Sequence, residues 1–180
     1  LSTQEDYSKA SPHIEFKNVF FKYDNSRFLI NDISFKLPHK ATLGIIGATG
    51  SGKTTLAQLL MRFYDIKSGE ILINGKDIRY MTLYDLRSRF GVVFQNDTLF
   101  KSTVEENLSL GRDIDLIQIK QAAQHAQAAK FIEEAGGYDA EVAIKGMNFS
   151  GGQKQRLLLT RALAGKPEII ILDDASSALD

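Results

Sequence analysis

Apolar and polar positions alternate over the first part of the chain. The alternation runs over residues 14–23, stops at the turn-like sequence DNSR (residues 24–27) and returns over residues 33–37. A period of two predicts half-buried antiparallel strands in both segments. Residues 41–47 (ATLGIIG) are nearly all apolar over a short stretch, which predicts a strand covered on both faces, as in a parallel sheet.

Helical spacing follows this short run. Leu56, Leu59, Leu60 and Phe63 recur every three to four residues, so the sequence predicts a helix over residues 53–63 that packs on the sheet. A strand, a tight loop and a helix together make half of a βαβ unit. The chain therefore begins like an α/β domain.

Strand and helix patterns continue to the end of the chain. An Asn-Gly turn should close a strand at residue 75, and Thr103 and Glu106 form a capping-box pattern at a helix start. The remaining predicted elements are a buried strand over 90–95, helices over 115–129 and 150–165, and a strand over 168–172 after Pro167.

Composition limits the class of protein. The chain has 180 residues, 43% of them hydrophobic, and its 22 Lys+Arg balance 22 Asp+Glu. This is enough for one domain with a core, and the zero net charge makes nucleic acid an unexpected partner. The absence of cysteine excludes a disulfide framework, a thiolate metal site and a Cys nucleophile. The longest apolar stretches, such as residues 169–172, are too short to span a bilayer.

The two ends suggest a piece of a longer chain. Residues 1–12 are polar, begin with Leu and lack the layout of a signal peptide, so we expect a linker there and the domain over 13–180. The chain stops at Asp180 without a polar tail. We expect a C-terminal truncation inside the domain.

The sequence from Gly47 to Thr54 matches GxxxxGK[ST] between a predicted strand and a predicted helix. In such a loop the glycines let the backbone wrap around phosphate, and the amides at the helix start point at the anion. Lys53 would reach the β and γ phosphates of ATP, and the Thr54 hydroxyl would ligate Mg²⁺. The alternative is a glycine-rich turn with an incidental lysine. The predicted nucleotide-binding residues here are Gly47, Thr49, Gly50, Ser51, Gly52, Lys53, Thr54 and Thr55.

A second acidic element accompanies this loop. The apolar run over 169–172 ends in Asp173 and Asp174, and a buried strand of this kind presents its aspartate to the metal in phosphate-loop enzymes. Polar residues also follow core strands for ordinary reasons. With the loop upstream, we predict that Asp173 is a metal ligand.

The sequence NFSGGQ at residues 148–153 precedes a predicted helix and resembles the LSGGQ signature of ATP-binding cassette (ABC) ATPases, with Phe in the first place. The order of the motifs also matches: phosphate loop, Gln95, signature, Asp173 and a D-loop at residues 177–180. A well-capped helix is the alternative, but a cap alone needs neither glycine. The resemblance implies head-to-tail pairing of two domains, with each ATP between one phosphate loop and the partner's Ser150, Gly151, Gly152 and Gln153.

The resemblance also implies a fold and further roles. It implies a P-loop NTPase with a mainly parallel core sheet, an N-terminal antiparallel β subdomain and an inserted α-helical signature subdomain at about 97–164. Tyr23 would stack on adenine, although a tyrosine in an alternating strand is an alternative reading. Gln95 would ligate the metal and sense a membrane partner. Residues 99–108 and 138–142 resemble the exporter branch.

Two departures from the family pattern are informative. The family's catalytic glutamate after the strand is here Asp174, whose shorter side chain costs about 1 Å of reach, and such an error can cost roughly 10²-fold in rate. This resembles the degenerate half of a heterodimeric exporter, which we favour over a homodimer with two slow sites. His13, His39 and His125 all precede Asp173, so none can be the family's switch histidine.

The sequence is consistent with three functions, which differ in the extent of ATP hydrolysis and in partner. The leading one is an exporter ATPase domain with Lys53, Gln95 and Asp174 in catalysis, ATP and Mg²⁺ as cofactors, and a second such domain and a transmembrane domain as partners, at the cytoplasmic face of a membrane. The second is a subunit that occludes ATP with little hydrolysis. The third, a soluble ABC ATPase acting on DNA or the ribosome, is disfavoured because the arginines at 79, 87 and 89 are scattered and no dense basic tract exists.

Overall fold

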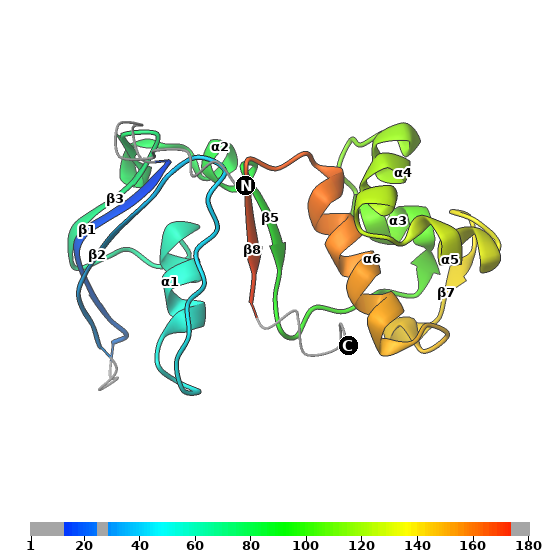
Figure 1. Ribbon diagram of the computed structural model, residues 1–180, viewed down its shortest axis with the longest axis horizontal. Helices are drawn as coiled ribbons and strands as arrows, with labels where there is room; N and C mark the ends of the chain where they lie inside the picture. The colour runs from blue at the N-terminus through cyan, green and yellow to red at the C-terminus, as the bar shows by residue number, and fades with distance from the viewer. Residues whose placement is uncertain (1–12, 25–28, 174–180) are drawn as a thin grey trace, which may run out of the picture. The chain divides into compact units, whose positions relative to one another are not determined.

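The computed structural model describes residues 13–24 and 29–173, and its chain divides into two compact units, Leu1–Leu86 and Arg87–Asp180. Figure 1 shows the elements of each unit. The predicted linker (1–12), the predicted D-loop (177–180) and Asp174 lie outside the described residues. The predicted boundaries of the helical subdomain stay a prediction.

The first unit contains a four-stranded antiparallel sheet in the order β2-β1-β3-β4. Its strands are β1 (Ile14–Lys22), β2 (Leu29–Leu37), β3 (Ser68–Ile73) and β4 (Lys76–Asp77). The alternating pattern therefore predicted the strand type and approximate limits, and Val19, Ile71 and Ile73 are fully buried. The N-terminal antiparallel β subdomain is confirmed.

A bulge interrupts β1 where Asn18 has φ 45°. Across from it, Gly69 has φ +91°, and a Cβ there would lie 2.3 Å from the carbonyl oxygen of Asn18. No side chain fits at that distance, so the bulge at Asn18 is compatible only with glycine at position 69.

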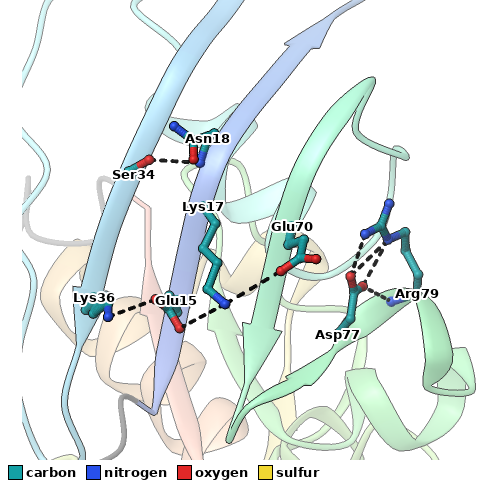
Figure 2. Close-up of polar contacts among 8 residues, drawn as sticks. All are labelled: Glu15, Lys17, Asn18, Ser34, Lys36, Glu70, Asp77 and Arg79. Carbon is teal, nitrogen blue, oxygen red and sulfur yellow. Dashed lines mark hydrogen bonds and ion pairs between the residues drawn. The ribbon is translucent and has the colours of Figure 1, made fainter.

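Charged side chains on neighbouring strands form a row of ion pairs (Figure 2). Lys36 Nζ lies 3.1 Å from Glu15, and Lys17 Nζ lies 3.8 Å from Glu15 and 3.6 Å from Glu70. Such pairs add little stability individually, but they match opposite charges across β2, β1 and β3. These side chains make one surface of the sheet polar, as the alternation predicts.

The β3–β4 connection is the predicted Asn-Gly turn. Asn74 (φ 50°) and Gly75 (φ 76°) both have positive φ, which suits the right-handed twist of a hairpin. Just after it, Asp77 accepts the Arg79 backbone N–H at 2.8 Å and pairs with the Arg79 guanidinium at 2.6 Å (Figure 2). Burial opposes ionisation of Asp77, yet its bonds to Arg79 hold the pKa of that carboxyl below its usual range.

The prediction of a buried strand over residues 41–47 is wrong for this structure. The segment is not in a ladder, Leu43 and Ile45 are exposed, and Ile46 is 99% exposed. Apolar composition alone does not make a strand, because a strand needs a hydrogen-bonded neighbour. Among the described strands of the first unit, none pairs with this segment.

The predicted helix after the glycine-rich loop is present but shorter. Helix α1 spans Lys53–Leu60, and Met61 is its C-cap. It does not continue because Arg62 adopts a left-handed conformation (φ 53°). Leu59 and Leu60 are buried, as the helical spacing predicted. The 3₁₀ turn η2 (Ile78–Tyr80) and the short helix α2 (Leu83–Arg87) follow the sheet.

The second unit contains a parallel pair of strands. Strand β5 (Phe90–Val93) pairs with β8 (Ile169–Leu172), with Phe90 opposite Ile169 and Val93 opposite Leu172. Helix α6 packs against β5 so closely that a Cβ on Gly91 would lie 2.5 Å from the Ala162 carbonyl oxygen. Within residues 13–24 and 29–173, parallel pairing is confined to this pair.

Four helices build the rest of the second unit: α3 (Val104–Ser109), α4 (Leu116–His125), α5 (Ala129–Glu134) and α6 (Gly151–Ala164). A two-stranded ribbon joins β6 (Ser102–Thr103) to β7 (Glu141–Val142), and the 3₁₀ turn η3 spans Ile144–Gly146. Their core includes Leu99, Val104, Leu108, Ile119, Ile132, Val142 and Leu157. The parallel β5–β8 pair with helix α6 packed against it agrees with the predicted α/β fold class.

The predicted helix over residues 115–129 is present but shorter. Helix α4 ends at His125 with Ala126 as its C-cap, Gln127 adopts φ 56°, and α5 begins at Ala129. The break is not visible in the composition, because glutamine is a good helix former. Both predicted capping boxes, at Thr103 and at Ser150, are confirmed.

Candidate functional site

The glycine-rich loop before α1 is wound tightly. The Ser51 N–H donates to the Ala48 carbonyl at 3.1 Å, and Gly50 (φ +80°) and Gly52 (φ +97°) have left-handed backbone conformations. A Cβ on Gly47 would lie 2.6 Å from the Ser51 hydroxyl oxygen. The loop is therefore a cradle that side chains would fill, and it leaves the backbone open to a close-fitting anion.

The Lys53 ammonium lies over this loop. Its Nζ donates to the carbonyl oxygens of Gly47 at 2.8 Å and Ala48 at 3.0 Å. The first turn of α1 contains no acidic residue, so both the lysine and the helix terminus contribute positive charge here. Thr54 is exposed beside Lys53, whereas Thr55 is buried.

Tyr23 is fixed next to α1 in the same unit. Its hydroxyl donates to Gln58 Oε1 at 3.1 Å and lies 3.1 Å from the Thr55 hydroxyl. The Tyr23 ring packs edge-on against Phe21 and Tyr64, with centroids 4.8 and 5.0 Å away. The structure thus joins the predicted adenine-stacking residue to the helix that carries the loop. Sequence reasoning missed Gln58, whose signal is its i, i+3 spacing from Thr55 on α1.

Gln95 and Asp173 follow neighbouring parallel strands of the second unit. The Asp173 N–H donates to the Val93 carbonyl at 2.9 Å, which extends the β5–β8 pairing to Asp173. Gln95 occupies the turn directly after β5, where it is exposed. The two residues therefore lie at the same edge of the parallel pair, as phosphate-loop chemistry requires of a metal-binding edge.

A residue that the sequence did not single out closes the Gln95 turn. The Asp97 carboxylate accepts the Phe94 N–H at 2.8 Å, and the Asp97 N–H donates to the Phe94 carbonyl at 3.1 Å. The carboxylate and the backbone N–H of Asp97 thus both bond to Phe94 and close the turn that contains Gln95.

Ser150 caps α6. The Gln153 N–H donates to the Ser150 hydroxyl at 3.3 Å, and Gln153 Oε1 accepts the Ser150 N–H at 2.8 Å. Phe149 is buried before the cap, with its ring 6.1 Å from that of Phe131. The buried phenylalanine anchors the helix start, while Ser150 and Gly151 stay exposed. The result is an accessible helix N-terminus with a hydroxyl beside it.

A buried arginine connects α6 to the chain segment after Gln95. Arg161 donates to the Asn107 backbone carbonyl at 2.8 Å, to Asn107 Oδ1 at 3.2 Å and to the Thr98 carbonyl at 3.0 Å. Burial lowers the pKa of Arg161 from the usual arginine range, and the charge of Asp97 partly opposes this. Neither Arg161 nor Asn107 was predicted as important, because a buried polar pair leaves no periodic signal.

The two segments that resemble exporters contact each other. Thr103 pairs with Glu141 in the β6–β7 ribbon, and the N–H groups of Val104 and Glu105 donate to the carbonyls of Ala140 and Tyr138 at 3.0 and 2.9 Å. Burial raises the pKa of the Tyr138 phenol. The segment before Ser150 is therefore held by the segment after Gln95.

The predicted site residues thus form two groups. Tyr23, the loop from Gly47 and residues 53–55 belong to the first unit, and Gln95, Asp173 and the Ser150 cap belong to the second. In the part of the chain that is described, no three His, Asp or Glu side chains gather as a metal-binding cluster. Mg²⁺ in nucleotide sites needs only one or two protein ligands besides phosphate oxygens, so hydroxyl, amide and carboxylate donors of this kind fit it.

The comparisons with known proteins decide the family. The ABC transporter family model matches residues 30–177. The chain belongs to the ABC transporter family. It is an ABC-type ATP-binding and ATPase domain, and its α/β fold is the ABC ATPase fold.

Similar members of the ABC family are exporters. The Beta-(1-->2)glucan export ATP-binding/permease protein NdvA of Bradyrhizobium diazoefficiens is 43% identical over 176 residues, which are 97% of this chain and 29% of that protein. The ATM1-type heavy metal exporter of Novosphingobium aromaticivorans is 42% identical over 94% of this chain and 28% of that protein. The solved structure of a bacterial Atm1-family ABC exporter with ATP bound aligns with a TM-score of 0.85 and 42% identity, over 94% of this chain and 30% of that one.

This chain therefore spans less than a third of the length of these relatives. Among the residues described, no helix is long and apolar enough to cross a membrane.

Proposed function

We propose that this chain is the ATP-hydrolysing domain of an exporter and couples MgATP binding, domain pairing and hydrolysis to movement of a substrate across a membrane. The observation that carries the proposal is the presence on one chain of two features suited to binding phosphate. One is the wound loop with Lys53, and the other is the exposed, Ser150-capped start of α6. Two such features on one chain suit a nucleotide held between two chains.

The first feature would bind the phosphates of ATP. The loop amides and the Lys53 ammonium would bind the β and γ phosphates and stabilise charge on the γ phosphate during attack by water. The Thr54 hydroxyl, Gln95 and Asp173 would hold Mg²⁺. When bound, this ion supplies further positive charge at the phosphate oxygens. Tyr23 would stack on the base from a ring that Gln58 and Thr55 hold in place.

The second feature would complete a site on another chain. Ser150, Gly151, Gly152 and Gln153 would bind the γ phosphate of ATP that lies on the partner's loop. Asp174 would stand where the catalytic glutamate is expected, and its shorter reach would slow hydrolysis at this chain's own site. We therefore propose a head-to-tail dimer, with a heterodimer favoured because a partner could supply the glutamate.

A membrane partner is part of the same proposal. Several relatives are named as combined ATP-binding and permease proteins, which supports a transmembrane domain as the partner of this chain at the cytoplasmic face of a membrane. The transported substrate would contact that domain.

The proposal is tested in the assembled transporter with Ser150→Ala and Lys53→Ala. Nucleotide bound at this chain is measured by photolabelling with azido-ATP, and turnover is measured separately. Lys53→Ala should abolish labelling of this chain. Ser150→Ala should leave that labelling unchanged and lower turnover at least tenfold, because the lost hydroxyl serves the partner's site.

Thr103→Ala is the matched control. It removes the capping box of α3, and such a cap is worth about 1 kcal/mol, but it touches neither phosphate feature. Labelling and turnover should both stay near the unmodified values. The head-to-tail proposal is wrong if Ser150→Ala abolishes labelling of this chain as Lys53→Ala does.

A further inference from the structure

Two histidines and an asparagine converge in the first unit, away from the loop and from Tyr23 in sequence. His13 directly precedes β1, His39 follows the end of β2, and Asn74 lies in the β3–β4 turn. His13 Nδ1 lies 2.9 Å from Asn74 Oδ1, and His39 Nε2 lies 3.1 Å from the same oxygen. The two imidazole rings are 4.0 Å apart between centroids. Nothing in the ATP-binding role uses these three residues.

The geometry directs both ring nitrogens at one point. An imidazole N–H that donates a hydrogen bond lies in the ring plane, and loss of its proton leaves a lone pair that points in the same direction. Because both bonds end on the same oxygen, the two nitrogen directions meet near Asn74 Oδ1. The two ring planes are inclined to each other by 35°. An ion about 2 Å from each nitrogen would lie between them and that oxygen, at zinc–imidazole distance.

The sheet holds these residues in place. The His13 N–H donates to the Leu37 carbonyl at 2.9 Å, and the Asn74 N–H donates to the His13 carbonyl at 2.9 Å. The neighbouring residue Ile14 is also paired on both sides, with Leu37 of β2 and with Ile73 of β3. His13 is itself buried, whereas His39 and Asn74 are exposed. The arrangement is preorganised on strand ends and open to solvent on one side.

We propose that His13 Nδ1, His39 Nε2 and Asn74 Oδ1 form a binding site for a divalent transition metal ion of the zinc class. Imidazole nitrogen suits Zn²⁺, Ni²⁺ and Cu²⁺, whereas Mg²⁺ prefers oxygen donors. The Asn74 side chain retracts by about 1 Å to leave room for the metal–nitrogen bonds. The exposed side leaves further positions for water, as in three-ligand sites. A bound ion links the start of β1, the end of β2 and the β3–β4 turn.

Zinc chloride titrated into the full chain without nucleotide tests the site by calorimetry. The unmodified chain should bind one Zn²⁺ per chain and show no comparable heat with Mg²⁺. His39→Gln, at an exposed position, should weaken the Zn²⁺ affinity at least tenfold. Asn74→Asp should strengthen it, because a carboxylate replaces a neutral oxygen donor. The chain has no cysteine to compete for the ion.

His125→Gln is the matched control, since His125 is an exposed histidine in the second unit. It should bind Zn²⁺ like the unmodified chain. A thermal unfolding scan with and without Zn²⁺ should show an upward shift that His39→Gln loses and His125→Gln keeps. The site does not exist if the unmodified chain takes up no Zn²⁺, if His39→Gln binds it undiminished, or if His125→Gln weakens it equally. None of these outcomes bears on ATP binding.

Discussion

At the scale of single residues, one hydroxyl group links Tyr23 to the helix that follows the glycine-rich loop. The Tyr23 hydroxyl bonds to Gln58 and lies beside Thr55, both on α1. The ring contacts of Phe21 and Tyr64 hold the plane of Tyr23 as well. Tyr23 is therefore held from the ring and from the hydroxyl, which keeps its stacking surface oriented before a base arrives.

Two substitutions of Tyr23 separate the contribution of its ring to ATP affinity from that of its hydroxyl group. Tyr23→Phe keeps the stacking surface and removes bonds worth about 0.5–1.5 kcal/mol, so ATP affinity should fall roughly two- to tenfold. Tyr23→Ala also loses base stacking, worth about 1–3 kcal/mol, and should bind ATP more weakly still. Calorimetry with MgATP measures both affinities. Unchanged affinity in Tyr23→Ala would contradict the base-stacking role.

At the scale of elements, the sequence correctly predicted the turn and the helix caps, which depend on residues that are neighbours in the chain. The Asn-Gly turn and the Thr103 and Ser150 caps depend on neighbours in sequence, and the structure has all three. The strand predicted over 41–47 is absent and the helix predicted over 115–129 is interrupted at Gln127, for different reasons. A strand needs a hydrogen-bonded neighbouring strand, which the apolar composition of a segment does not reveal. The helix breaks at Gln127 because its backbone has a positive φ, which is not expected for glutamine, a good helix former.

The helix break gives a prediction about stability. Gln127 holds φ 56°, a left-handed conformation that costs about 1 kcal/mol for a residue with a Cβ and little for glycine. Gln127→Gly should therefore raise the free energy of unfolding by about 0.5–1 kcal/mol in urea titrations. Gln124→Gly, three residues earlier inside α4, should lower it by a similar amount. Equal destabilisation by both would show that the break carries no strain.

At the scale of the whole molecule, motif order predicted the family and the candidate residues, while the contacts that support them were invisible. The match over residues 30–177 agrees with the order of phosphate loop, Gln95, signature and Asp173. Arg161 reaches Asn107 across 54 positions and Thr98 across 63. Contacts at such separations come from packing, which no spacing rule describes.

The proposal that hydrolysis is slow at this chain's own site depends on Asp174. If its short side chain limits hydrolysis, Asp174→Glu in the assembled transporter should raise turnover at this chain's site, by up to about 10²-fold. Turnover is measured by phosphate release, with the partner's own site inactivated at its phosphate-loop lysine. No rise would show that Asp174 is not the limiting feature and would remove the main support for a degenerate site.

If the loop around Lys53 binds the phosphates of ATP, calorimetry with MgATP should detect the loss of that lysine. Lys53→Ala removes a charge-assisted contact worth about 1.5–3 kcal/mol, so affinity should fall at least tenfold. Lys130→Ala removes a lysine of α5 that pairs with Glu134, and its affinity should match that of the unmodified chain. Equal MgATP affinity in Lys53→Ala and the unmodified chain would show that Lys53 does not bind the phosphates of ATP.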